Sequence, residues 1–270
     1  MQQKLFFISY FASNFFNTLY TLFSYSLSGT DIFLIIAVGI LTGMSKTGIH
    51  GAGMLSVPLL AMVFGGQQSS GTMLPILLLA DIIGVWYYHR HASFKHLKML
   101  IPWALAGIFL GTVIGKKIDD HTFRLIMAIT IILSIGLMIW LNKDRHKEDV
   151  PHNRWFAASM GISGGFTSMV GNLAGSVMAV YFLAAKLPKN VFIGTTAWFF
   201  LIINWLKVPF HVFSWHTINL NTFLFALCSL PAIILGAFIG INIVHKISEA
   251  NYRWLIILMT IVAAIFMLFK

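Results

Sequence analysis

Apolar runs recur along almost the whole chain, and short polar connectors separate them. A helix needs about 20 apolar residues to cross a bilayer, and the alternating strands of a membrane β-barrel are absent from these runs. The pattern therefore predicts an all-α fold, a polytopic transmembrane helical bundle. The predicted segments are residues 31–64, 67–88, 98–117, 122–141, 154–184, 190–211, 221–244 and 252–269.

The composition agrees with a membrane protein and argues against a soluble enzyme. Of the 270 residues, 58% are hydrophobic and 10% are charged, whereas globular domains are about 25% charged. The 18 Lys and Arg residues outnumber the 8 Asp and Glu residues. They gather in the connectors, as in loops of an inner or plasma membrane protein, so we expect the bilayer and not nucleic acid as partner. The single cysteine, Cys228, excludes an intrachain disulfide and is interpreted as a packing residue.

The longest strongly polar stretch divides the chain near its middle, at residues 142–153. We predict a cytoplasmic linker there, between a first transmembrane repeat at residues 31–141 and a second at residues 154–270. Residues 1–30 are predicted to form an additional N-terminal hydrophobic helix that spans the membrane or lies in its interface. The stretch is longer and more polar than the core of a signal peptide.

Matches between the two halves keep the same order along the chain, which indicates an internal duplication. One match lies in the second segment of each half, where Asp81 corresponds to Asn204. The other matches are Gly43 with Gly161, Ser45 with Ser163, Gly71 and Thr72 with Gly194 and Thr195, Gly111 and Gly115 with Gly236 and Gly240, and Arg124 with Arg253.

The first segment of each half is too long for one untilted helix, and its middle is rich in glycine and polar residues. These stretches are GMSKTGIHGAG at residues 43–53 and GISGGFTSMVGNLAG at residues 161–175. Glycine there favours a broken helix or a re-entrant hairpin, although it also permits close packing of membrane helices. The polar side chains among the glycines favour the broken element.

The distribution of basic residues predicts that the two repeats are inverted relative to each other. If each broken segment enters and leaves on the same side, most basic connectors share one side, which the positive-inside rule makes cytoplasmic. Lys116 and Lys117 disagree with this arrangement. The cytoplasmic connectors are then residues 89–98, 142–154, 184–190 and 245–253, and the connectors without Lys or Arg are residues 64–71 and 212–220.

Three formally charged side chains fall within the predicted spans and away from the span ends, namely Lys46, Asp81 and Lys207. A charge near the bilayer centre costs roughly 2.5 to 3.5 kcal/mol, so such residues usually face a cavity or a partner. One lysine comes from each half, so the two can flank a central anion, although Lys207 can instead snorkel to the interface. Asp81 can neutralise a lysine, carry a proton or form a structural ion pair.

The breaks also supply hydrogen-bond donors that suit an oxyanion. A broken helix points unpaired N–H groups and the positive end of its dipole into the membrane. His50 in the first break, and His211 near a segment end, can relay protons or serve a structural role. Side-chain candidates are Ser45, Thr47, Ser163, Thr167, Ser168, Asn172 and Ser176, although each can instead bond its own backbone or a neighbouring helix.

Both glycine-rich stretches, with the residues that follow them, resemble the sulfite exporter TauE/SafE family, also called the TSUP family. The first motif is GMSKTGIHGAGMLSVPLLAMVF at residues 43–64, and the resemblance covers nearly all of residues 31–269. It implies a membrane carrier for sulfite, sulfonates or related sulfur compounds, often an exporter. Many members have an aspartate and four consecutive glycines in the first motif, where this chain has Ser45-Lys46 and GIHGAG.

The positions that match the family motifs extend the candidate site beyond the charged residues. Asp81 is the residue predicted to couple protons or charge. The predicted substrate-binding residues are Lys46, Thr47, His50, Gly51, Gly53, Gly165, Thr167, Asn172, Gly175, Thr195, Asn204 and Lys207.

The predicted function is secondary transport, in the direction of export, of a sulfur-containing anion such as sulfite or sulfoacetate. Alternating access is the expected mechanism, with proton coupling as an option. An anion channel and an uptake permease for another small anion are the alternatives. An intramembrane enzyme would need an assembled nucleophile, acid and base or a metal site, which one carboxylate and scattered histidines do not provide. We predict no cofactor and no metal; the partners are a small anion and the lipid bilayer, and a homodimer remains a hypothesis.

Overall fold

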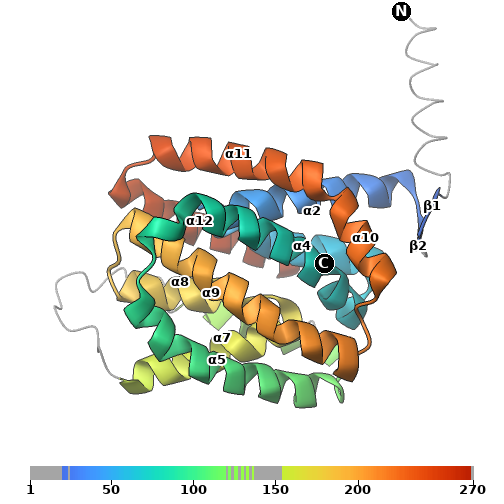
Figure 1. Ribbon diagram of the computed structural model, residues 1–270, viewed down its shortest axis with the longest axis horizontal. Coiled ribbons are helices and arrows are strands. Elements are labelled where there is room, and N and C mark those ends of the chain that lie inside the picture. Colours follow the sequence, from blue (N-terminus) through green and yellow to red (C-terminus); the bar gives the residue numbers. More distant parts are fainter. Residues whose placement is uncertain are drawn as a thin grey trace, which may run out of the picture.

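The computed structural model describes residues 20–23, 25–119 and 154–268, together with residues 121–122, 125–126, 129–130, 132–133 and 136. Helices dominate this part, which confirms the predicted all-α bundle (Figure 1). The first half contains β1 (Tyr20–Leu22), β2 (Tyr25–Leu27), α2 (Gly29–Lys46), α3 (Ala52–Phe64), α4 (Gly66–Tyr88), the 3-10 helix η1 (His89–His91) and α5 (Phe94–Gly115). The second half contains α7 (Arg154–Gly171), α8 (Ala174–Ala184), α9 (Lys189–Pro209), the π-helix η2 (Phe210–Ser214), α10 (Leu220–Cys228), α11 (Leu230–Lys246) and α12 (Glu249–Leu268).

Four helices of the described part are long and apolar enough to cross a membrane, which agrees with a polytopic bundle. The pair α10–α11 makes a fifth span if it is taken as one helix with a bend of 49°. The sequence predicts this stretch as one segment, and Pro231 near the start of α11 explains the interruption because proline lacks a backbone donor. The segment predicted at 122–141 lies largely outside the described residues. The four spans are Gly29–Lys46, Gln68–His91, Phe94–Gly115 and Lys189–Ser214.

The N-terminal helix predicted for residues 1–30 is wrong over residues 20–27. There β1 and β2 form a two-stranded antiparallel hairpin. At its turn Phe23 has a φ of 55°, a left-handed conformation that a right-handed helix does not contain. Residues 1–19 of the predicted helix lie outside the described part of the chain.

Both predicted helix breaks are confirmed. A turn separates α2 from α3, and in it Gly48 has a φ of 126°, which residues with a side chain rarely adopt. A shorter turn separates α7 from α8, and in it Asn172 has a φ of 55°. Because neither helix continues through its turn, helix ends lie inside the bundle.

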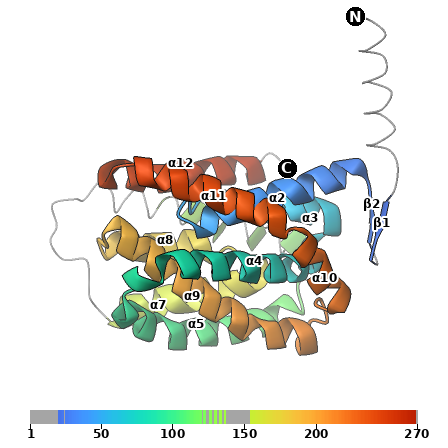
Figure 2. The same ribbon diagram turned by 45° about the horizontal axis from the view of Figure 1, so that its top comes forward.

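Two tight helix pairs flank the centre of the bundle, α2 with α11 and α5 with α7 (Figure 2). Glycines bring the backbones together in both pairs. A Cβ on Gly43 would overlap the Ile233 carbonyl oxygen, and a Cβ on Gly165 would overlap that of Ala104. Each pair joins a helix of the first half to a helix of the second, so the two halves of the sequence are interleaved. This pairing fits a duplicated chain, and the inverted relation of the repeats stays a prediction.

The largest apolar core lies among α5, α8, α9 and α12, where Phe182, Phe192 and Phe199 are almost completely buried. Next to this core, α4 packs against α9. These two helices carry Asp81, Asn204 and Lys207 into the interior, where they meet the ends of the broken helices.

Gly165→Ala is expected to destabilise the protein, because the new methyl group would overlap the Ala104 carbonyl in the α5–α7 pair. Overpacking of this kind costs about 1 to 3 kcal/mol. Gly136→Ala is the matched control, since nothing lies within 4 Å of a Cβ built there. Thermal unfolding in detergent should show a lower midpoint for the Gly165 variant alone. Equal midpoints would contradict the α5–α7 contact.

Candidate functional site

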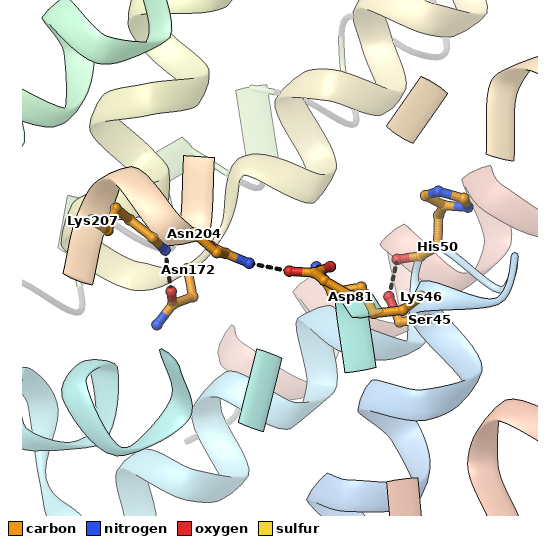
Figure 3. A network of polar contacts seen from close by, with 7 residues as sticks. All are labelled: Ser45, Lys46, His50, Asp81, Asn172, Asn204 and Lys207. Atoms are coloured by element: carbon orange, nitrogen blue, oxygen red, sulfur yellow. Dashed lines mark hydrogen bonds and ion pairs between the residues drawn. The ribbon is translucent and has the colours of Figure 1, made fainter. Parts of the chain in front are cut away.

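A buried ion pair links the first break to α4 (Figure 3). Lys46 Nζ lies 2.8 Å from Asp81 Oδ1, and the two side chains are 8% and 0% exposed. Lys46 belongs to the last turn of α2, where the negative end of the helix dipole favours a cation. Its ammonium group also lies 3.9 Å from the centre of the Phe200 ring. Within the described residues, the Lys46 ammonium group is the charged partner of Asp81 Oδ1.

The same carboxylate reaches the second half of the chain. Asn204 Nδ2 on α9 donates a hydrogen bond of 2.5 Å to Asp81 Oδ2. Asn204 Oδ1 is buried and has no hydrogen-bond partner among the described residues. Asp81 and Asn204 are the two positions that the sequence comparison of the halves matches. Through this one carboxylate, α2, α4 and α9 are joined.

The second lysine lies at the other break. Lys207 is completely buried, and its Nζ donates to Ser168 O at 3.1 Å and to Asn172 Oδ1 at 2.7 Å. Both acceptors belong to the C-terminal end of α7, so the ammonium group lies where the helix dipole favours a cation. Both acceptors are also neutral, and no carboxylate pairs with Lys207 in the described part of the chain. This burial does not fit a side chain that snorkels to the interface.

Asn172 connects the second lysine to α4. Its Nδ2 donates to Ser70 O at 3.2 Å and to Ser70 Oγ at 3.1 Å. Asparagine tolerates the left-handed backbone found here better than most residues do. The same residue therefore ends α7, holds the Lys207 ammonium group and contacts α4. The polar network thus consists of one bonded cluster at each break, and α4 and α9 contribute residues to both clusters.

A cavity of about 30 Å³ lies between the two breaks. This volume has room for one or two water molecules, so a larger anion enters only when helices move apart. Gly53 and Gly175, the second residues of α3 and α8, both line it, so two helix N-termini border the same space. That arrangement favours an anion. The other lining residues are Ser45, Lys46, His50, Met54, Leu77, Ser168, Asn172, Thr196, Ala197, Phe200 and Asn204.

Several predicted site residues gather around this cavity, and Asp81 and Lys207 bond directly to its lining residues. The backbone carbonyl of His50 accepts a hydrogen bond of 3.4 Å from Ser45 Oγ. The imidazole points away from Lys46 (Figure 3) and lies 3.0 Å from the Tyr252 hydroxyl of α12. The predicted residues that line the cavity are Lys46, His50, Gly53, Asn172, Gly175 and Asn204.

Other predicted substrate-binding residues lie in helix contacts or in hydrogen bonds to the backbone, and Thr167 lines a separate cavity of about 430 Å³. A Cβ on Gly51 would overlap the backbone of α12, and Gly165 belongs to the α5–α7 contact. The hydroxyls of Thr47 and Thr167 donate to backbone carbonyls one turn earlier in the chain. Thr195 accepts a hydrogen bond of 2.9 Å from the backbone N–H just before α5. In this structure these five residues do not line the cavity between the two breaks.

Sequence reasoning named the lining hydroxyls of Ser45 and Ser168 but missed Thr196 and the apolar walls of the cavity. Phe200 and Thr196 precede Asn204 by one and two turns on α9, and Leu77 precedes the α4 carboxylate by one turn. A spacing of four places them on the same helix face as the polar residues. Following that face from each buried charge would have identified them. Ser70 joins the network through a tertiary contact, and no local signal marks it.

The network can hold an anion through charge and hydrogen bonds. It offers two ammonium groups, one carboxylate, two carboxamides and two helix N-termini. Among the described residues, no group of three or more His, Cys, Asp or Glu side chains is placed to hold a metal ion.

Comparison with protein families matches residues 32–267 to a family described as Sulfite exporter TauE/SafE. The matched range includes both breaks and the whole polar network, and it confirms the resemblance found in the sequence. No curated protein and no solved structure matched the chain.

Asn172→Ala and Asn172→Gly separate the two structural roles of this residue. Both remove the amide and leave the buried Lys207 ammonium group with one fewer acceptor, which costs about 1 to 3 kcal/mol. Alanine adds about 1 to 2 kcal/mol in a left-handed conformation, whereas glycine does not. Unfolding midpoints in detergent should fall in the order wild type, glycine variant, alanine variant. A glycine variant as stable as wild type would contradict the role assigned to the amide.

Proposed function

The chain belongs to the sulfite exporter TauE/SafE family, and from that premise we propose that it exports a sulfur-containing anion by alternating access. Family membership makes the chain a multi-pass membrane protein of a transporter family, in agreement with its membrane-spanning helices. The substrates that we propose are sulfite or an organosulfonate such as sulfoacetate.

The buried Lys207 ammonium group is the observation that carries the proposal. An unpaired charge in an apolar interior is costly and persists where it serves a partner. Lys207 donates to two neutral oxygens, and in the described residues Asp81 pairs with Lys46. The network therefore retains an excess positive charge. An anion that enters the adjacent cavity would gain both this charge and the N-termini of α3 and α8.

The small cavity supports a carrier that changes conformation during transport. The space beside the network is about 30 Å³, which is smaller than the proposed substrates need. Opening requires one group of helices to move against another. The tight α2–α11 and α5–α7 pairs are natural rigid groups, since their backbones are in contact at glycines. The moving bodies that we propose therefore mix helices from both sequence halves.

The membrane potential favours export over uptake of an anion. An inside-negative potential drives one negative charge outward with about 2.3 kcal/mol per 100 mV. If transport is coupled to protons, Asp81 is the carboxylate of this network through which coupling would act. A channel would need a continuous open passage, which a cavity of about 30 Å³ does not favour. Membership of a transporter family likewise favours transport over enzymatic activity.

Labelled sulfite in proteoliposomes tests the proposed function. Wild-type protein should give saturable transport. Lys46→Met and Lys207→Met should each reduce the initial rate by roughly ten- to a hundredfold, the scale of a lost hydrogen bond to a charged group. Lys98→Met is the control, because Lys98 is an exposed lysine on α5 outside the network.

Two results would count against this proposal. If wild-type protein in liposomes transports neither sulfite nor sulfoacetate, the proposed substrates are wrong. If both folded lysine variants transport normally, the proposed site is wrong. A flux that rises linearly with concentration would favour the channel.

The proposed orientation is tested by labelling introduced cysteines in a Cys228→Ser background. His91→Cys lies in a connector predicted to be cytoplasmic, and Leu220→Cys lies at the other end of the bundle; both positions are exposed. A membrane-impermeant maleimide should label Leu220→Cys in intact bacterial cells. It should label His91→Cys only after the membrane is opened. Labelling of both from outside would contradict the proposed topology.

A further inference from the structure

The charges of the polar network do not balance. Lys46 and Lys207 contribute two ammonium groups, and Asp81 contributes one carboxylate. The spans described here contain one more carboxylate, Asp31, but it accepts hydrogen bonds from Ser28 in the first turn of α2. That position is about 22 Å from Lys46 along the helix axis. One positive charge of the network is therefore left over.

The leftover charge is localised at Lys207. Its Nζ donates to a carbonyl and a carboxamide, which are partial charges only. The Lys46 ammonium group, by contrast, is held between the Asp81 carboxylate and the Phe200 ring. The buried histidines contact hydroxyl and carbonyl groups rather than carboxylates in the described structure. Asp81 is already paired with Lys46, and no carboxylate of the described structure forms an ion pair with Lys207.

We propose that Asp81 restricts the transported anion to a single negative charge. This inference rests on the proposed function and narrows its substrate class to singly charged sulfur oxyanions, such as hydrogen sulfite or a monosulfonate. Of the substrates proposed above it keeps sulfite, as hydrogen sulfite, and excludes sulfoacetate, which carries two negative charges. A monovalent anion makes the substrate-loaded network neutral. A neutral site has the lowest free-energy cost in an apolar interior. A divalent anion leaves one negative charge that no group balances. The Lys46–Asp81 pair thus reserves one lysine for the substrate.

Matched anions of equal shape and unequal charge test this rule. Methanesulfonate and sulfate share a tetrahedral sulfur and differ by a methyl group in place of a charged oxygen. Ethanesulfonate and sulfoacetate form a second pair with two carbons each. Each anion is tested as a competitor of labelled sulfite transport in proteoliposomes. Wild-type protein should prefer the monovalent member of each pair by about tenfold or more, because one extra charge at close range dominates the difference.

Two single substitutions shift the network charge in opposite directions. Asp81→Asn raises it by one, so the preference should move toward the divalent members by about tenfold or more. Asn204→Asp lowers it by one and should weaken competition by every anion, the divalent members most. Asn204 is suited to this change because its amide touches the Asp81 carboxylate. The combination Asp81→Asn with Asn204→Asp restores the total charge and should restore the monovalent preference.

The possible outcomes separate the charge rule from the proposed function. If wild-type protein in liposomes transports no sulfite, the proposed function is wrong. Sulfite transport with a wild-type preference for divalent anions, or with no competition by monovalent anions, would overturn the charge rule alone. An unchanged preference in folded Asp81→Asn protein would also overturn it. If Asp81→Asn does not fold, the double variant Asp81→Asn with Asn204→Asp tests the rule. A preference of that variant for divalent anions would contradict the rule.

Discussion

The ion pair between Lys46 and Asp81 constrains the rest of the interior. Two charges can lie among apolar helices because they neutralise each other at 2.8 Å and because Asn204 bonds the second carboxylate oxygen. The pair requires α2 to approach α4 closely, and Gly84 permits this, since a Cβ there would lie 2.5 Å from the Lys46 carbonyl oxygen. The first break follows directly after Lys46, so the helix end, the charge and the cavity coincide.

The two halves use corresponding positions in different ways. In α4 the carboxylate at position 81 is followed three residues later by Gly84, which packs on the end of α2. In α9 the amide at position 204 is followed three residues later by Lys207, which bonds the end of α7. The lysine thus comes from the broken helix in one half and from the facing helix in the other. The interior thus holds two lysines and one carboxylate, which pairs with Lys46, and the imbalance provides the charge that an anion can satisfy.

The sequence predicts most reliably those residues whose burial in a membrane costs the most free energy. Buried charges are expensive in a membrane, so Lys46, Asp81 and Lys207 could be identified by their presence in apolar runs, and all three meet in the network. The glycine-rich breaks were likewise predictable. Glycine has a second use in close helix packing, however, and one residue in a single sequence does not reveal which use applies. Gly165 therefore lies in a helix contact, whereas Gly175 lines the cavity. Hydroxyl groups are ambiguous in the same way, because Thr47 and Thr167 bond their own helices.

Equilibrium binding of sulfite to purified protein, measured by titration calorimetry in detergent, tests the central claim that the two buried lysines form an anion site. Wild-type protein and the exposed-lysine variant Lys98→Met should show saturable binding with one site per chain. The double variant Lys46→Met and Lys207→Met should show none while remaining folded. Binding by the double variant with unchanged affinity would contradict the account, because it would place the anion outside the network.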